Sequence, residues 1–181
     1  MKTAEKLLDA AELRMRRGGY NSVSFRDLAS DVNIKSASVH YHFPTKEAMT
    51  ISLVERYSAR IFEQLDLRSN KAERPEDRLA AFSAVYEAAL KHDGAVCLCV
   101  MLGSELPGLP QDLQAVVKKF FEANIEWVAK ALPSGLSTAE KRRRASTYVA
   151  AHQGAMLMAV AVEDYRVLGG LGKTLVPSML R

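Results

Sequence analysis

Apolar residues recur at the spacing of an α-helix along most of the 181-residue chain. Breaks rich in Gly, Pro and Asn separate the apolar stripes. The pattern predicts helices from the N-cap Thr3 to Gly18-Gly19, then over Phe25 to Val32, Lys35 to Phe43, Lys46 to Arg68, Pro75 to Lys91, Val96 to Leu106, Gln111 to Leu132, Thr138 to Val162, and in a final apolar segment to Leu180. The expected fold class is all-α.

The helix over Phe25 to Val32 is short and leads into a tight turn. Ser24 suits its N-cap, because a hydroxyl accepts a bond from a free backbone N–H. Asn33 stands at the turn, and Asn tolerates a left-handed backbone better than any residue except Gly. The apolar residues of this helix follow one another at i, i+3, i+4 and i+7 and should share one buried face: Phe25, Leu28, Ala29 and Val32.

The next short helix needs only Val39 and Phe43 to dock on its neighbours. Its polar and aromatic groups are therefore expected to face a partner: Lys35, Ser36, Ser38, His40, Tyr41 and His42. Two short helices joined by a tight turn, the second carrying such groups, are how a protein reads the major groove of DNA.

Pro44 closes the second short helix, and Thr45 is placed to cap the helix that follows. Lys46 then lies at a helix N-terminus, where free N–H groups and the helix dipole favour an anion. We therefore expect Lys46 to hold a phosphate.

Composition describes an ordinary folded protein, with 48% hydrophobic and 25% charged residues and a net charge of +4. No apolar run approaches the roughly 20 residues that cross a bilayer, and the N-terminus lacks the pattern of a signal peptide. The expected location is the cytoplasm, without a membrane partner. Cys97 and Cys99 stand two positions apart, which disfavours a disulfide within a helix, so both are expected as thiols.

No enzyme motif is found in the sequence: a phosphate-binding Gly-rich loop, a zinc-protease helix and a nucleophile elbow are all missing. His40 and His42 are i and i+2, a poor metal pair on a helix. We therefore expect neither catalysis nor a metal or cofactor site. An alternative is a helical interaction module whose basic N-terminal part binds a protein.

The segment from Leu7 to Leu53 resembles the N-terminal domain of TetR/AcrR-type transcriptional regulators. The resemblance rests on Ser-Phe-Arg-Asp-Leu-Ala, the short turn, and Ser-Val-His-Tyr-His-Phe-Pro-Thr-Lys-Glu. It implies a three-helix DNA-binding head with a helix-turn-helix, residues 1–46, and a larger helical ligand-binding and dimerisation body, residues 47–181. Two residues depart from the family pattern: Asn33 replaces the usual Gly, and His40 replaces the commoner Tyr.

The resemblance also implies which residues contact a double-stranded DNA operator. Ser38 and His40 are expected at base edges, and Tyr41, His42 and Lys46 at phosphates. His42 has the alternative of packing against the core of the head. Arg26 matches a position that reaches a base in some relatives, with a solvated side chain as the equal alternative. The complete DNA-binding set is Arg26, Lys35, Ser36, Ser38, His40, Tyr41, His42 and Lys46.

The resemblance further implies a switch, in which a small molecule bound in the body shifts the helix Thr45 to Arg68 and with it the separation of the two heads. Candidate contacts for this effector are inward residues of the body helices, although aromatics at helical spacing are more often core: Tyr57, Tyr86, Cys97, Phe120, Phe121, Trp127, Tyr148 and His152. Glu105 and His152 are a possible polar anchor. A variant regulator that senses electrophiles or oxidants through Cys97 or Cys99 is a second alternative, weakened by their apolar surroundings.

A homodimer is expected through Thr138 to Val162 and the C-terminal segment, with a core within one chain as the alternative. Small and apolar residues form a smooth ridge there: Ala151, Gly154, Ala155, Met158 and Ala161 or Val162. The expected function is a ligand-responsive transcriptional regulator, a repressor that binds a palindromic operator as a homodimer and is released by a small molecule.

Overall fold

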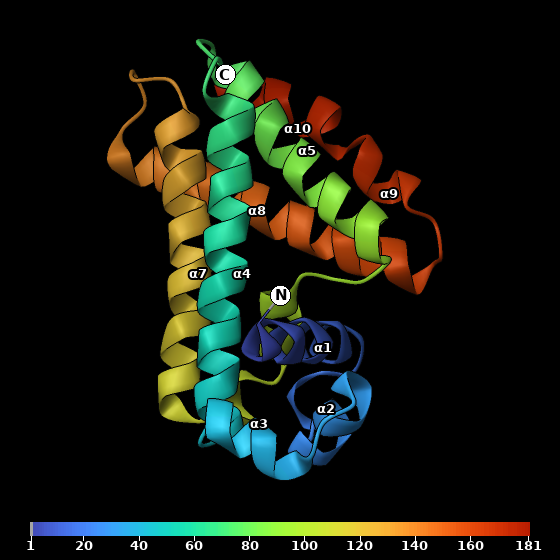
Figure 1. The fold of residues 1–181 in the computed structure, drawn as a ribbon. Helices are drawn as coiled ribbons and strands as arrows, with labels where there is room; N and C mark the ends of the chain where they lie inside the picture. The colour runs from blue at the N-terminus through green and yellow to red at the C-terminus, as the bar shows by residue number, and fades with distance from the viewer. Residues whose placement is uncertain (1) are drawn as a thin grey trace. The chain divides into compact units, whose positions relative to one another are not determined.

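A computed structural model of the chain describes residues 2–181, within which every regular element is a helix (Figure 1). The all-α prediction is confirmed. The long helices are α1 (Thr3–Gly18), α4 (Lys46–Ser69), α5 (Pro75–Asp93), α7 (Gln111–Ala131) and α8 (Thr138–Ala161). The shorter ones are η1 (Tyr20–Ser22), α2 (Phe25–Val32), α3 (Ser36–His42), α6 (Leu98–Ser104), η2 (Leu106–Gly108), α9 (Arg166–Gly169) and α10 (Leu171–Leu180).

Contacts divide the chain into two compact units. The first contains the chain up to Ala59 together with Leu98–Lys119, and the second contains Arg60–Cys97 and Phe120–Arg181. Helices α4 and α7 each supply residues to both units. The boundary expected after residue 46 stays a prediction.

Several predicted helix ends were wrong. Thr3 is already helical and Lys2 is the N-cap, its backbone N–H donating to Glu5 Oε2 at 3.0 Å. Helix α8 begins at Thr138 as predicted, and its N-cap is Ser137, whose hydroxyl accepts the Glu140 N–H at 3.2 Å. Helix α6 is shorter than the apolar run that predicted it, and α9 was not predicted.

The two short helices of the first unit follow the prediction closely. The Ser24 hydroxyl accepts the Asp27 N–H at 3.1 Å, and Asn33 is left-handed with φ 56°. The Ile34 N–H then returns to the Ala29 carbonyl at 2.9 Å, which closes the turn. Leu28 and Ala29 are buried as expected, whereas the outer members of the predicted face, Phe25 and Val32, are only half-buried.

A network of charged groups fixes α1 against α4 within the first unit. Arg56 on α4 pairs with Asp9 at 2.8 Å and approaches Glu12 at 3.5 Å. Glu12 also pairs with Arg16 at 3.6 Å, and the Arg16 guanidinium lies 6.0 Å from the centre of the Tyr57 ring. Glu12 and Arg16 are buried, so each charge depends on its partner for solvation.

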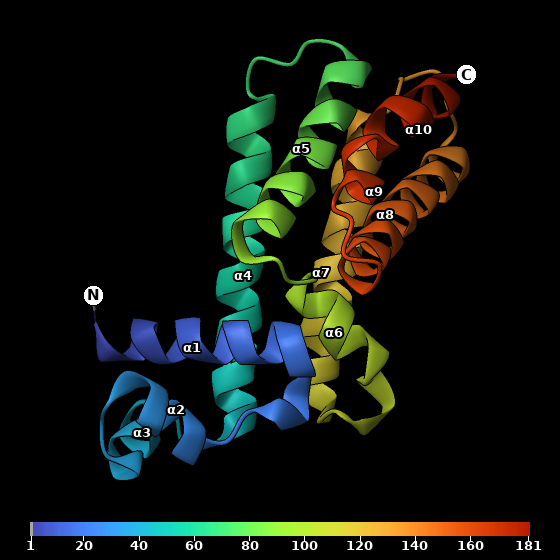
Figure 2. The same cartoon turned by 90° about the vertical axis from the view of Figure 1, so that its right-hand side faces the viewer.

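Helices α5, α8 and α10 pack together in the second unit (Figure 2). Helix α10 lies close to α5 at Gly172, where a Cβ would collide with the Ser83 side chain. Arg144 is half-buried and donates to the Met179 carbonyl at 2.9 Å. It thereby holds the last turn of α10 against α8.

Within residues 2–181, no helix combines the length and apolar character needed to cross a membrane.

Candidate nucleic-acid interface and effector site

Helix α3 turns one narrow face inward and leaves the rest exposed. Val39 is fully buried and Phe43 is 8% exposed, as the sequence predicts. Tyr41 is 87% exposed, the most exposed of the large apolar side chains in the described chain. Lys35, Ser36 and His40 are also exposed, whereas Ser38 and His42 are half-buried. The helix therefore presents most of the predicted DNA-binding set on one surface.

Ring contacts orient two of the predicted contacts. The His40 ring meets Phe25 of α2 edge to face, with centroids 4.8 Å apart. The His42 ring meets Tyr41 in the same way at 5.3 Å. Such pairs stabilise one arrangement of the rings and reduce the entropy lost on binding. Arg26, on α2, is exposed.

Lys46 is engaged within the first unit. Thr45 caps α4 by accepting the Ala48 N–H at 3.0 Å, so Lys46 begins the helix as expected. Its ammonium lies 4.0 Å from the centre of the Tyr20 ring, and partial burial lowers the pKa of Lys46 while the nearby Glu105 carboxylate opposes that shift. Glu105 Oε2 accepts the Tyr20 backbone N–H at 2.7 Å.

The proposed polar anchor of Glu105 with His152 is not what the structure shows, because each group has other partners. Glu105 binds the backbone of Tyr20 in the first unit. His152 binds Ser83 in the second. Spacing along the chain gave no signal for either pair.

Most predicted effector contacts of the second unit form a buried cluster around Phe82. The Phe82 ring lies 4.8 to 6.0 Å from four other rings, those of Tyr86, His152, Tyr148 and Trp127. Tyr86, Tyr148 and His152 are fully buried, and Trp127 is half-buried. These side chains fill the space between their helices with one another.

A chain of hydrogen bonds runs through this cluster. His152 Nδ1 lies 2.9 Å from its neighbouring backbone oxygen, that of Tyr148, and Nε2 lies 2.8 Å from the Ser83 hydroxyl. Ser83 lies 2.8 Å from the Tyr148 hydroxyl, which donates to the Leu79 carbonyl at 2.9 Å. A neutral His152 donates from Nδ1 to the Tyr148 carbonyl and accepts the Ser83 hydrogen at Nε2, and the Tyr148 hydrogen is then shared between the Leu79 carbonyl and the Ser83 oxygen. Burial lowers the pKa of His152 and raises that of Tyr148 to about 12.

A second buried pair joins α5 to α7. The Tyr86 hydroxyl donates to Asn124 Oδ1 at 2.7 Å, and Asn124 Nδ2 donates to the Phe120 carbonyl at 2.8 Å. Sequence reasoning missed Ser83 and Asn124. Their signal was present, because each is a polar residue inside an otherwise apolar helical stripe.

The remaining predicted contacts lie elsewhere. Tyr57 belongs to the first unit and is buried, and Phe121 is half-buried beside Phe120, with ring centroids 5.6 Å apart. Cys97 and Cys99 are fully buried thiols outside any disulfide, and the Cys97 backbone N–H donates to Met156 Sδ at 3.1 Å. A thiol without access to solvent is a poor target for an oxidant or electrophile.

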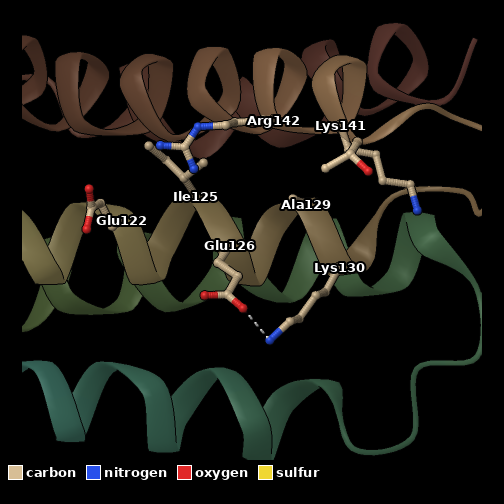
Figure 3. A pocket seen from close by; sticks show the side chains of 8 residues that line it. Glu122, Ile125, Glu126, Ala129, Lys130, Lys141 and Arg142 are labelled. Atoms are coloured by element: carbon tan, nitrogen blue, oxygen red, sulfur yellow. Dashed lines mark ion pairs between the residues drawn. The ribbon is translucent and has the colours of Figure 1, made fainter.

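An open groove of about 500 Å³ lies between α7 and α8 (Figure 3). Five of the eight residues that line it are charged, and Glu126 pairs with Lys130 one turn further along α7 at 2.7 Å. Binding sites for small molecules are mostly apolar and enclosed. None of the predicted effector contacts lines this groove.

Comparisons with known proteins connect the chain to a family of regulators. The family profile described as bacterial regulatory proteins, tetR family, matches residues 7–53. Solved structures of TetR-family regulators from Agrobacterium tumefaciens and Legionella pneumophila share 26% and 29% sequence identity, with TM-scores of 0.89 and 0.90; both comparisons cover 99% of this chain and 98% of the other.

Residues 7–53 match the TetR family, and the two solved TetR-family regulators share the fold of nearly the whole chain. Among TetR-family relatives, the transcriptional repressor NemR of Escherichia coli is 25% identical over 137 residues, which are 74% of this chain and 68% of NemR. The HTH-type transcriptional regulator YuxN of Bacillus subtilis is 26% identical over 70% of this chain, but the chain spans only 44% of the length of YuxN. These relatives are transcriptional regulators, not enzymes. Within residues 2–181, no cluster of three or more His, Cys, Asp or Glu side chains is arranged to hold a metal ion.

His152 should make stability depend on pH. Its pKa in the folded protein lies below the ordinary value of 6.5, so the unfolded chain binds the proton first as the pH falls. The contribution of neutral His152 to the free energy of unfolding is fully present above pH 6.5. It is lost toward lower pH, by at most about 1.4 kcal/mol per pH unit. Urea unfolding at pH 7.5 and 5.5 measures this loss. His152→Gln should reduce it, whereas His92→Gln, at an exposed histidine, should not; equal loss in all three proteins would contradict the assignment.

Gln153 of α8 is 6% exposed, and neither its Oε1 nor its Nε2 has a hydrogen-bond partner among the described residues. Because an unpaired buried polar group costs about 1 to 3 kcal/mol, Gln153→Met should raise the free energy of unfolding. Gln114 is the matched control, since its Nε2 donates to the Leu109 carbonyl at 2.8 Å and Gln114→Met should lower stability. Urea denaturation of both variants compares them. A destabilised Gln153→Met protein would show that the amide is satisfied.

Proposed function

We propose that the chain is a ligand-responsive repressor that binds a palindromic DNA operator as a homodimer and is released by a small molecule. The observation that carries the proposal is the surface of α3, where Val39 and Phe43 anchor the helix and the groups able to contact DNA face outward. A helix held in this way fits the major groove, and its polar groups reach base edges and phosphates. The proposal is also supported by the relatives, which are named as a transcriptional regulator and a transcriptional repressor.

The predicted dimer face of α8 supports this assembly. Leu157, Met158 and Val162 are 48%, 58% and 59% exposed. Gly154 lies on the same face, and a Cβ at this position would meet no atom within 4 Å. An apolar row around a small residue allows a second helix to approach closely. Two copies joined here would read two half-sites of one operator.

An effector bound in the second unit would have to separate the closely packed rings around Phe82 or meet the unpartnered amide of Gln153. Such a ligand shifts the protein toward the conformation it prefers. The cysteine-sensing alternative gains no support, because both thiols are fully buried.

Replacing Tyr41 or Lys46 by Ala should weaken binding to a duplex from upstream of the chain's own gene by about tenfold, because each removes a phosphate contact. For Lys46→Ala, the plot of log K against log salt concentration should also become shallower by about 0.9. Fluorescence anisotropy at several salt concentrations gives both quantities.

Two matched variants control for the loss of an exposed ring and of a lysine. Tyr165→Ala removes a tyrosine that is 40% exposed in the second unit, and Lys130→Ala removes an exposed lysine of α7. Both should bind DNA as the parent does. If Tyr41→Ala and Lys46→Ala also bind unchanged, the helical interaction module becomes the better interpretation.

Gly154→Glu should separate the dimer without unfolding the chain. The new side chain has free space within one chain, but in the dimer it would bury a charge at the ridge. Sedimentation velocity should show a monomer, and operator affinity should fall by more than about tenfold because only one half-site is read. Ala80→Glu, at an exposed alanine of α5, should remain dimeric. A dimeric Gly154→Glu protein would exclude this face.

A further inference from the structure

We propose that Glu105 sets how strongly the head binds DNA, by holding Tyr20 beneath Lys46 and competing with a DNA phosphate for the Lys46 ammonium. The inference rests on the proposed function and adds a positioning residue to it. Glu105 follows α6 and belongs, with Tyr20 and Lys46, to the first unit. Glu105 lies outside the helix-turn-helix formed by α2 and α3.

The contact of Glu105 with the link between α1 and α2 is specific. Its Oε2 accepts the Tyr20 N–H at 2.7 Å, across 85 positions of the chain. Gly19 makes the approach possible, since its φ of 76° is left-handed and a Cβ there would overlap the Glu105 carboxylate. A charged acceptor on a backbone N–H forms a stronger bond than a neutral one. The carboxylate therefore fixes the backbone that carries the Tyr20 ring.

The Tyr20 ring in turn holds Lys46. The ammonium lies 4.0 Å from the ring centroid, within the range of a cation–π interaction. Lys46 is half-buried, which disfavours its charge, and the Glu105 carboxylate favours that charge without being in direct ion-pair contact. The cation thus has a ring and a counter-charge inside the protein.

A DNA phosphate at the N-terminus of α4 must compete with the Tyr20 ring and the Glu105 carboxylate for the Lys46 ammonium. It must draw the ammonium from the ring and approach against the negative charge of Glu105. Both effects lower the affinity for DNA when Glu105 is in place. Because α6 packs against α1, a shift of the α6 segment changes the position of Glu105 and the availability of Lys46 together.

A double-mutant cycle tests the inference. Glu105→Gln keeps an oxygen that can accept the Tyr20 N–H but removes the charge, so it should raise operator affinity about threefold. In a Lys46→Ala background the same substitution should have a clearly smaller effect, because the cation is missing and only the repulsion between Glu105 and the phosphate remains. Anisotropy titrations of the four full-length proteins on the upstream duplex give the coupling.

Glu126→Gln is the matched control, since it removes a carboxylate that pairs with a lysine at the exposed groove and changes the net charge equally. It should leave the affinity unchanged. Glu105→Ala should lower the melting temperature, whereas Glu105→Gln should not, because only the alanine variant leaves the Tyr20 N–H without its acceptor.

The inference is overturned if Glu105→Gln acts no differently from Glu126→Gln, or acts equally with and without Lys46. Its failure is distinguishable from failure of the proposed function. Specific binding that depends on Tyr41 but not on the Glu105–Lys46 pair rejects only the inference. A parent protein that does not bind the duplex specifically rejects both.

Discussion

The constraint on which the reading surface depends is the shortness of α3. A helix of seven residues is unstable alone in water, because nucleation costs more than so few hydrogen bonds return. Its shape therefore depends on burial of Val39 and Phe43 and on the left-handed turn at Asn33. These few residues hold the helix in place, so its exposed side chains, among them Ser36 and Tyr41, are available to a partner. Because the helix is short and needs few buried residues, most of its surface can carry groups that contact a partner.

The helices that support α3 are joined by charges as well as by apolar packing. Arg56 of α4 reaches Asp9 and Glu12 of α1, and Glu12 also pairs with the buried Arg16. Removing one partner from such a network leaves another charge buried and unsolvated, so the groups keep their positions together. The beginning of α4 and the helix α1 should therefore move as one body. This is what a regulator needs if a shift of α4 is to displace the reading helix rather than be absorbed between them.

The features predicted correctly are those set by neighbours in sequence. The cap at Ser24, the turn at Asn33 and the inward pair Val39 and Phe43 follow from propensity and helical period, which act over a few residues. The features that were missed join distant positions. Glu105 meets Tyr20 across 85 positions and Ser83 meets His152 across 69, and no periodicity encodes which partner a buried polar group finds. Periodicity also marks a side chain as inward without telling whether it will meet its own core or a ligand.

In the second unit, hydrogen bonding distinguishes buried side chains that belong to the core from those that could contact a ligand. Around His152 every polar group has a partner, and the chain can reverse: a protonated Nε2 donates to Ser83, Ser83 donates to the Tyr148 hydroxyl, and Tyr148 donates to the Leu79 carbonyl. A network in which every polar group already has a partner leaves little for a ligand to bind, and inserting a ligand would break bonds already made. Gln153 is the opposite case, since its buried amide retains an unused donor and an unused acceptor. A ligand that pairs with this amide gains hydrogen bonds without breaking any. A polar effector would therefore bind at lower cost beside Gln153 than among the rings around Phe82 that the sequence predicted as its contacts.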